Sequence, residues 1–326
     1  MDRFPGIDAL PRGIRVAATV GVFDGVHRGH EAVLRSVVRL ATDTGSASLV
    51  VTFTPHPETV LRGSTPLLLC DPVERTARFA QLGVDHLVVQ SFDSAFAAQS
   101  AAVFLSRLTA GRDLAGLVMS VESAFGHDRE GNLERVRAIA ATSGFPVVEV
   151  PSLRLGGERV SSTRVRADLE AGRLADAARS LGRRPAVIGT VVHGDRRGRE
   201  LGFPTANLAF DDPVCLPPNG VYAVHVSWGG ADPLAPRYQA DGVASLGVRP
   251  TFGGGARLLE AHLFDFDGDL YDQRLRVGFV RRQRGEHRFE SVDALVAQMR
   301  LDVTRARAIL ARLPADRTPV RLAENK

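Results

Sequence analysis

The sequence predicts an α/β domain built on a parallel sheet, followed by a small antiparallel β-barrel domain with a C-terminal helix. In the first half, short apolar strand-like runs alternate with helical patterns, which is typical of a parallel sheet covered on both faces. In the second half, β-rich runs follow one another across Gly/Pro/Asp turns, which indicates a closed antiparallel sheet. The 326 residues suit two domains, each able to bury its own core.

The composition is that of an ordinary soluble protein, with 44% apolar and 24% charged residues. The formal charge of +4 is slight, and no basic run is interleaved with aromatic residues, so we expect no nucleic-acid partner. The N-terminus lacks a signal-peptide pattern and no apolar run approaches membrane-spanning length, which predicts a cytoplasmic protein with no membrane partner. Cys70 and Cys215 lie far apart and imply no disulfide framework.

The elements of the first half follow from its apolar spacing. The predicted strands are Ile14–Val20, Ala47–Phe53, His86–Gln90, Leu114–Met119 and Val147–Val150. The predicted helices are Glu31–Ala41, Pro72–Leu82, Ala101–Leu108, Leu133–Ala141 and Ala167–Leu181. We place the domain boundary after Arg184, giving domains of residues 1–184 and 185–326.

The second half contains β-rich runs and one long helix at its end. The predicted strands are Val187–His193, Val221–Trp228, Tyr238–Leu246, Leu258–Phe266 and Leu275–Arg281. The helix spans about Ser291 to Leu313, with Ser291 as its cap and an apolar stripe that we expect to pack on the barrel.

A glycine-punctuated turn, Gly21 to His30, lies between the first strand and the first helix. Glycines let the backbone approach a phosphate chain, and a helix N-terminus offers unpaired N–H groups and partial positive charge. His27 and His30, three residues apart at the start of this helix, can both reach one anion. The other candidate phosphate-binding residues here are Gly21, Phe23, Asp24, Gly25 and Gly29.

Commoner motifs do not fit this turn. It has neither the G-x-x-x-x-G-K-[ST] of a P-loop nor the G-x-G-x-x-G of a dinucleotide site. The glutamate of the zinc motif H-E-x-x-H is missing, and Arg28 between the two histidines would oppose a divalent cation. Two solvated histidines on a turn remain the alternative.

A polar stretch, Arg159 to Arg166, follows the fifth strand. Hydroxyl groups followed by arginine form a clamp for phosphate, because guanidinium binds phosphate bidentately. The candidates are Arg159, Ser162, Thr163 and Arg164. An N-cap for the following helix explains the same Ser and Thr residues, and the two roles are compatible.

The second half carries its own phosphate signature between His193 and Asn207. A glycine- and arginine-rich loop precedes Pro-Thr-Ala-Asn, and Thr205 and Asn207 offer the hard oxygen ligands that Mg²⁺ prefers. The candidate ATP-binding residues are His193, Gly194, Asp195, Arg196, Gly198, Arg199 and Pro204. A hairpin loop with surface charge is the plainer alternative.

Glu260 is the candidate general base of the second half. In strand alternation it shares a face with His262 and Phe264, opposite Leu259 and Ala261. A carboxylate there can accept a proton from a substrate hydroxyl. A lone acidic residue on a solvated face is the alternative.

The signatures together resemble the bacterial bifunctional riboflavin kinase/FAD synthetase family. Gly21–His30 and Ser161–Arg164 are similar to its nucleotidyltransferase motifs, and Gly202–Leu208 and Glu260–Tyr271 to its kinase motifs. The resemblance implies a Rossmann-like first domain of nucleotidyltransferase type. It also implies that the second half phosphorylates riboflavin with ATP and Mg²⁺, and that the first half joins FMN and ATP to give FAD and pyrophosphate.

The resemblance assigns roles to the candidate residues. Glu260 would be the general base of the kinase, with Thr205 and Asn207 holding metal and phosphates. His27, His30 and Arg164 would stabilise charge in adenylyl transfer, with help from the hydroxyls of Ser162 and Thr163.

The first half departs from the family on the flavin side. Ser123 stands where a flavin-contacting Phe is expected, Ser120 where the family has Gly, and Thr54 where it has Asp; Glu122 lies in the same altered stretch. Three interpretations stay open: a bifunctional enzyme with an altered FMN pocket, a riboflavin kinase with a non-catalytic first domain, or a transferase with another acceptor or nucleotide. The oligomeric state, a homo-oligomer included, and the preferred flavin redox state are not fixed by the sequence.

Overall fold

The computed structural model describes residues 1–194, 197–248 and 257–313. Two compact units emerge: residues 1–67 and 75–164 form the first, and residues 68–74 and 165 onward form the second. The expected boundary after residue 184 concerns function and stays a prediction. By packing, the residues from 165 to 184 group with the second unit.

The first unit is a six-stranded parallel sheet in the order β1-β4-β3-β2-β5-β6. Its strands are β1 (Asp2–Phe4), β2 (Arg15–Val20), β3 (Ala47–Thr54), β4 (His86–Ser91), β5 (Asp113–Ser120) and β6 (Val147–Val150). Its longer helices are α1 (Arg28–Thr44), α5 (Ala101–Thr109) and α6 (Leu133–Ser143), together with most of α3 (Pro72–Gln81). The shorter elements are η1 (Ile7–Ala9), α2 (Pro57–Arg62), α4 (Ser94–Ala97), η2 (His127–Arg129) and the hairpin β7 (Arg154–Leu155) and β8 (Glu158–Arg159).

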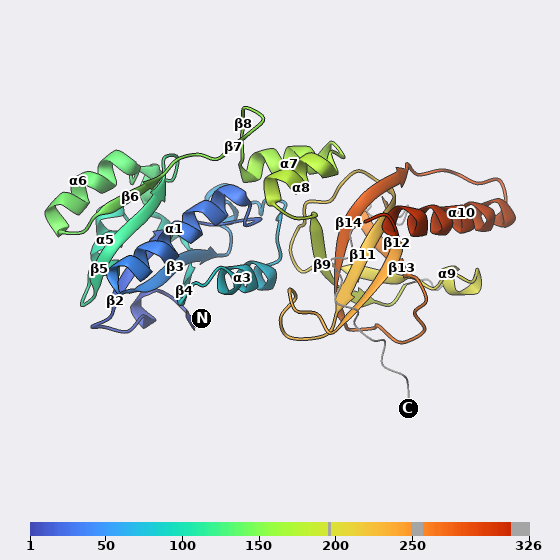
Figure 1. The fold of residues 1–326 in the computed structure, drawn as a ribbon, viewed down its shortest axis with the longest axis horizontal. Helices are drawn as coiled ribbons and strands as arrows, with labels where there is room; N and C mark the ends of the chain where they lie inside the picture. The colour runs from blue at the N-terminus through green and yellow to red at the C-terminus, as the bar shows by residue number, and fades with distance from the viewer. Residues whose placement is uncertain (195–196, 249–256, 314–326) are drawn as a thin grey trace. The chain divides into compact units, whose positions relative to one another are not determined.

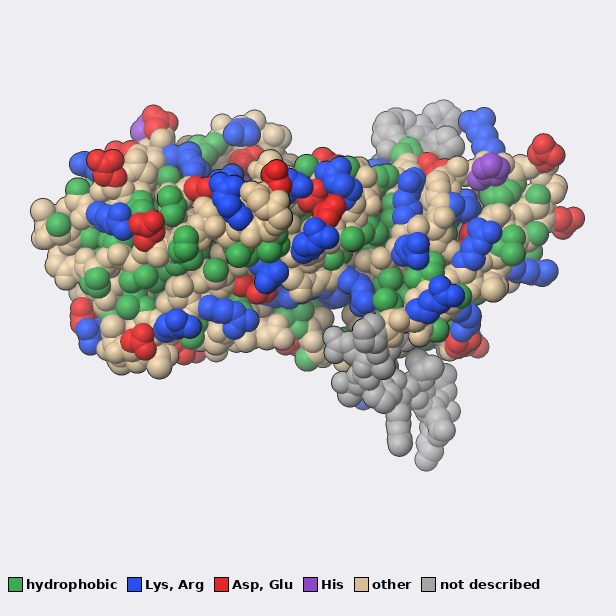
Figure 2. Space-filling view, turned by 45° about the horizontal axis from the view of Figure 1, so that its top comes forward, with side chains coloured by type: hydrophobic (Ala, Val, Ile, Leu, Met, Phe, Trp, Pro, Cys, Tyr) green, Lys and Arg blue, Asp and Glu red, His purple; other side chains and the backbone are tan. Residues whose placement is uncertain are grey.

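Both faces of this sheet are covered, as the sequence predicts. Alternate residues of β2 enter different clusters, because successive side chains of a strand point to opposite faces. Ala17 packs with Leu34 of α1 and Phe79 of α3, whereas Val16 packs with Phe104 of α5. Figure 1 shows these helices around the sheet, and Figure 2 shows basic and acidic side chains interspersed on the visible face of this unit.

The five predicted strands of the first half are confirmed with small shifts at their ends. The edge strand β1 is missed, because three residues are too few to show a period. The single helix expected over Ala167–Leu181 is wrong: α7 (Ser162–Glu170) and α8 (Leu174–Leu181) are separate. Gly172 interrupts them with φ of 74°, a left-handed conformation that suits glycine and ends a helix.

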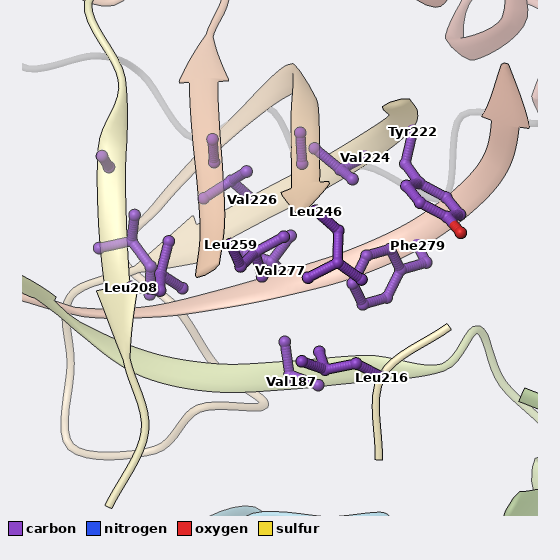
Figure 3. Close-up of a cluster of buried hydrophobic side chains, with 14 of the residues drawn as sticks. Val187, Leu208, Leu216, Tyr222, Val224, Val226, Leu246, Leu259, Val277 and Phe279 are labelled. Carbon is purple, nitrogen blue, oxygen red and sulfur yellow. The ribbon is translucent and has the colours of Figure 1, made fainter. Parts of the chain in front are cut away.

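The second unit contains a closed six-stranded antiparallel barrel in the order β10-β13-β12-β11-β14-β9. Its strands are β9 (Ala186–Val192), β10 (Ala206–Ala209), β11 (Gly220–Trp228), β12 (Tyr238–Val248), β13 (Arg257–Leu263) and β14 (Arg274–Arg284). The short strand β10 and the helix α9 (Arg197–Glu200) are additions to the predicted elements. Figure 3 shows the apolar interior, where Leu208, Leu246, Leu259 and Phe279 meet.

A short segment from the first half of the chain, residues 68–74, completes the second unit. Leu68 forms a parallel bridge with Val214, and Leu69 lies in the barrel core. Asp71 pairs with Arg274 at 2.5 Å. The domain therefore includes residues that lie far from it in sequence.

Glu74, at the end of this segment, forms buried ion pairs with two arginines. Its side chain is almost fully buried. Arg276 donates to it from Nε at 3.0 Å and from Nη2 at 3.3 Å, and Arg183 Nε lies 3.7 Å away. A buried carboxylate needs such partners, because leaving it unpaired in the interior is costly.

The last helix, α10 (Val292–Leu310), begins after Ser291, whose hydroxyl accepts from the Ala294 N–H as predicted. Ala306 and Leu310 pack against the barrel with Val303 and Leu313, which confirms the C-terminal part of the expected apolar stripe. The buried Asp302 fixes the helix to β14 by pairing with Arg284 at 2.7 Å. Across the described residues, no helix has the length and apolarity needed to cross a membrane.

Candidate active sites

The loop after β2 is tightly folded at the carboxyl edge of the sheet. Phe23 has φ of 54°, Gly25 of 81° and Val26 of 36°, and the Val26 N–H donates to the Phe23 carbonyl at 3.0 Å. Asp24 is buried, and Gly21 packs beside the Phe23 ring, where an added Cβ would lie 3.1 Å from it. This turn brings the chain from the strand to the start of α1, as the predicted phosphate cradle requires.

His27 is the N-cap of α1, and only 5% of it is exposed. Its Nδ1 accepts a hydrogen bond from the His30 N–H at 3.1 Å, so the neutral ring carries its proton on Nε2. The two imidazole rings stack at 3.6 Å, and Phe23 contacts His30 edge-on. The alternative of two solvated histidines does not hold for His27, since it is buried.

Gly29, near the start of α1, leaves room for the His27 ring because it has no side chain. A Cβ at Gly29 would lie 3.2 Å from the His27 ring and 3.6 Å from the Val160 carbonyl oxygen. The stretch before α7 therefore lies against the start of α1.

The same stretch is tied to the first loop by Ser162. Its hydroxyl donates to the Asp24 carbonyl at 2.9 Å, while the Ser161 hydroxyl accepts from the Arg164 N–H at 3.2 Å as a helix cap. The cap interpretation of the Ser/Thr cluster is confirmed, and the phosphate clamp stays a prediction. Thr163 is exposed in the first turn of α7.

Arg159 and Arg164, the candidate phosphate clamps, are each paired with a carboxylate in this structure. Arg164 Nη1 lies 3.1 Å from Glu158, and Arg159 forms an ion pair with Glu122. The hydrogen bond from Arg159 lowers the pKa of Glu122 below its usual range. Phosphate binding by either guanidinium would compete with these carboxylates.

The stretch that departs from the family contains a serine pair. The hydroxyls of Ser120 and Ser123 lie 2.7 Å apart, so Ser123 closes a turn where an aromatic ring was expected. Phe125 remains, half-buried, with its ring 5.2 Å from that of Phe104. Thr54 is exposed at the end of β3.

In the second unit, Asn207 and Glu260 are directly opposite each other on β10 and β13. Opposed residues of antiparallel strands project to the same face. Their neighbours Leu208 and Leu259 enter the barrel core, so Asn207 and Glu260 lie on the outer face. Asn207 is nonetheless 7% exposed, which shows that something covers it.

The glycine-rich loop supplies that cover. A Cβ at Gly194 would lie 2.5 to 2.7 Å from the side-chain atoms of Asn207. A Cβ at Gly198 would lie 2.4 Å from the Phe203 carbonyl oxygen and 3.2 Å from Thr205 Oγ1. These two glycines place the loop backbone against both candidate metal ligands, where no side chain fits.

The loop also contains Arg199, a candidate ATP-binding residue. Arg199 is exposed, and its carbonyl accepts from the Gly202 N–H at 3.1 Å. Asp195 and Arg196, also predicted to bind ATP, lie outside the described residues.

Two contacts that hold this loop were not predicted. The rings of His193 and Tyr271 pack at 3.9 Å, which fixes the start of the loop. His262 Nδ1 lies 2.8 Å from the Pro204 carbonyl oxygen, which fixes its end. Tyr271 ends the kinase-like run Glu260–Tyr271, so its place in that run could have indicated that it belongs to the site.

The donor set fits a magnesium–nucleotide complex. The Thr205 hydroxyl and the Asn207 amide oxygen are hard neutral donors, suited to an ion whose other ligands are phosphate oxygens and water. Among the described residues, no three or more His, Cys, Asp or Glu side chains gather as metal ligands. A metal held mainly by a substrate does not need such a cluster.

Comparisons with known proteins match the two halves of the chain to two different family models. Residues 12–164 match the family model described as FAD synthetase, and residues 181–310 match that described as riboflavin kinase. A bifunctional riboflavin kinase/FMN adenylyltransferase of Pseudomonas fluorescens is 39% identical over 90% of this chain and 93% of its own length. The protein of the same name from Escherichia coli K12 is 38% identical over 89% and 91%.

A solved structure has a fold similar to that of most of this chain. It is described as a macrolide-efflux protein from Streptococcus pneumoniae and is 29% identical, with a TM-score of 0.83 over 94% of this chain and 98% of its own.

Proposed function

The chain belongs to the bifunctional riboflavin kinase/FMN adenylyltransferase family, and we propose that each activity uses the residues gathered in the matching unit. The protein is a transferase with both activities. The two other interpretations, a kinase with a silent first domain and a transferase for another acceptor or nucleotide, are not favoured.

In the kinase reaction, Glu260 takes the proton from the ribityl hydroxyl of riboflavin as that oxygen attacks the γ-phosphorus of ATP. The observation that supports this role is the opposed pair Asn207 and Glu260 under the glycine loop. The loop from His193 to Arg199 holds the phosphates, and FMN and ADP are the products. Thr205 and Asn207 would hold a magnesium ion, which would neutralise charge on the phosphate oxygens.

In the adenylyl transfer, a phosphate oxygen of FMN attacks the α-phosphorus of ATP and pyrophosphate leaves. No protein nucleophile is needed, so the protein acts by position and charge. His27 donates from Nε2, because its Nδ1 is already an acceptor. Together with His30 and the arginines Arg159 and Arg164, it stabilises the negative charge that grows on the phosphates.

This function is tested by incubating the protein with riboflavin, ATP and Mg²⁺ and separating the flavins by chromatography. We expect FMN to appear first and FAD after it. Formation of FMN from riboflavin without FAD, together with no FAD from supplied FMN, would contradict the role proposed for the first unit. A cytoplasmic location is retained as a prediction, with riboflavin, FMN and ATP as the small-molecule substrates.

A further inference from the structure

A basic groove lies in the second unit between the end of β14 and the C-terminal half of α10. The hollow is open to solvent, has a volume of about 410 Å³ and is lined by four exposed arginines: Arg281 and Arg282 from the strand and Arg305 and Arg312 from the helix. Figure 2 shows mainly basic side chains over the region where α10 lies in Figure 1. We define these four residues and the hollow between them as the arginine groove.

The helix contributes to the groove through one regular stripe. Arg305, Ala308, Ile309 and Arg312 follow the i, i+3, i+4, i+7 spacing of a single helix face. Ala306 and Leu310, on the neighbouring face, pack on the barrel. The stripe is therefore fixed beside β14 by the packing of the helix.

Within the described residues, no carboxylate lines the groove or pairs with Arg281, Arg305 or Arg312. Nearby acids are already held by other arginines: Asp302 by Arg284 and Asp265 by Arg307. Basic residues near a helix C-terminus are favoured by the helix dipole. That effect explains arginines on α10 but not Arg281 and Arg282 on β14, of which Arg282 also donates from Nη2 to the Asn219 carbonyl at 2.6 Å.

Gln283 adds an independent observation. It also lines the groove, and the nitrogen and oxygen of its amide are buried without a hydrogen-bond partner in the described part of the chain. Buried polar groups in native proteins are nearly always hydrogen-bonded. Because these two amide atoms are closed to solvent, a ligand in the groove would hydrogen-bond them only after the neighbouring side chains move.

We propose that the arginine groove binds a small molecule carrying two or more linked phosphates, at a site separate from both active sites. Guanidinium groups bind phosphate oxygens bidentately, and several arginines around one hollow match several phosphate oxygens. The volume exceeds that needed for a single ion and lies within the range of small-ligand pockets. None of the described residues assigned to the kinase reaction lines it.

Hydrogen–deuterium exchange on the full chain locates such binding directly. Sodium tripolyphosphate is the probe, and sodium sulfate at equal ionic strength controls for charge screening. The variant Arg305→Gln/Arg312→Gln is compared with Arg300→Gln/Arg135→Gln, which removes the same charge from exposed positions outside the groove.

We expect tripolyphosphate to slow exchange in the peptides that contain residues 281–283 and 305–312, in wild type and in the control variant. The groove variant should weaken this binding by at least about tenfold, because two charged hydrogen-bonding groups are lost. Both catalytic rates at saturating substrate should stay unchanged. Parallel runs with ATP and with pyrophosphate distinguish a nucleotide from an inorganic ligand.

Four results would overturn the proposal. The first three are an absence of protection in these peptides, protection that the groove variant retains, and equal protection by sulfate. The fourth is protection by a short oligonucleotide but not by tripolyphosphate.

Discussion

The two proposed active sites are held in different ways. In the first unit, backbone turns and a capped helix N-terminus position His27, and the proposed clamp arginines Arg159 and Arg164 already pair with carboxylates. In the second unit, the site depends on the register of two strands and on glycines packed against Asn207. The first site should therefore respond when a carboxylate that pairs with Arg159 or Arg164 is removed, whereas the second should respond less to changes in surface charge.

The largest effect should come from removing the proposed base of the kinase. We expect Glu260→Gln to lower FMN formation by about 10²–10⁴-fold, because the amide cannot accept the hydroxyl proton. Formation of FAD from supplied FMN should be unchanged. Glu170→Gln, at an exposed position of α7, is the matched control, and normal phosphorylation of riboflavin by Glu260→Gln would show that its role is wrong.

The segment of residues 68–74 offers the sharpest test of how the second unit is built. Glu74→Ala leaves Arg276 and Arg183 without their buried partner, so we expect a loss of about 3–5 kcal/mol in the stability of that unit. Thermal inactivation of the kinase in the full chain measures it. If Glu74→Ala and Glu170→Ala lose kinase activity at the same temperature, the segment is not part of the folded kinase unit.

In the first unit, His27→Asn separates chemistry from folding. Asparagine is a good N-cap, so α1 should remain intact, but the Nε2 donor is lost. We expect FAD formation from FMN to fall by about 10²–10³-fold, as when an oxyanion donor is removed. Kinase activity in the same sample shows that the protein is folded, and an unchanged transferase rate would remove His27 from the mechanism.

A smaller effect should come from crowding the kinase loop. Gly194→Ala places a Cβ within 2.7 Å of the Asn207 side chain, closer than real contacts allow. We expect a fall of about tenfold in kinase kcat/KM for ATP, a cost of ~1.4 kcal/mol in transition-state stabilisation. Gly278→Ala, whose nearest new neighbour lies at 3.6 Å, should leave it nearly unchanged.

The smallest effect should follow from releasing Arg159. Both partners of the Arg159–Glu122 pair are nearly half exposed, and such pairs contribute at most about 1 kcal/mol. Glu122→Gln should therefore lower the transferase KM for ATP by up to about fivefold, since phosphate no longer competes with a carboxylate. A rise in KM would show that Glu122 instead positions the arginine.

The stability that the Arg159–Glu122 pair adds should depend on pH. Because Arg159 lowers the pKa of Glu122 in the folded protein, the stability that the ion pair adds is complete above the usual carboxyl pKa. This stability is lost as the pH falls through the lowered pKa. The difference in free energy of unfolding between wild type and Glu122→Gln should thus persist at neutral pH and disappear only in acid.

Local patterns predicted the elements well but not their long-range partners. The strand and helix periods located the parallel sheet, and Ser291 located the start of α10. Leu68 to Glu74 gave no local sign of joining the barrel, because that depends on contacts with residues such as Val214 and Arg276.

For the sites, residue type indicated the chemistry but not the environment. The spacing of His27 and His30 predicted a shared anion site, yet the burial and ring stacking depend on Gly29 and Phe23 around them. The strand β10 was missed because its four residues were interpreted only as a phosphate motif. Its pairing with β13 is what brings Asn207 opposite Glu260.

The central claim, that two independent sites act in succession on one flavin, is tested most directly by complementation. Glu260→Gln and His27→Asn are each supplied with riboflavin, ATP and Mg²⁺, alone and mixed. Each variant alone should make almost no FAD, whereas the mixture should make it, because FMN released by His27→Asn reaches the intact transferase site of Glu260→Gln. A mixture that makes FMN but no FAD would contradict the account.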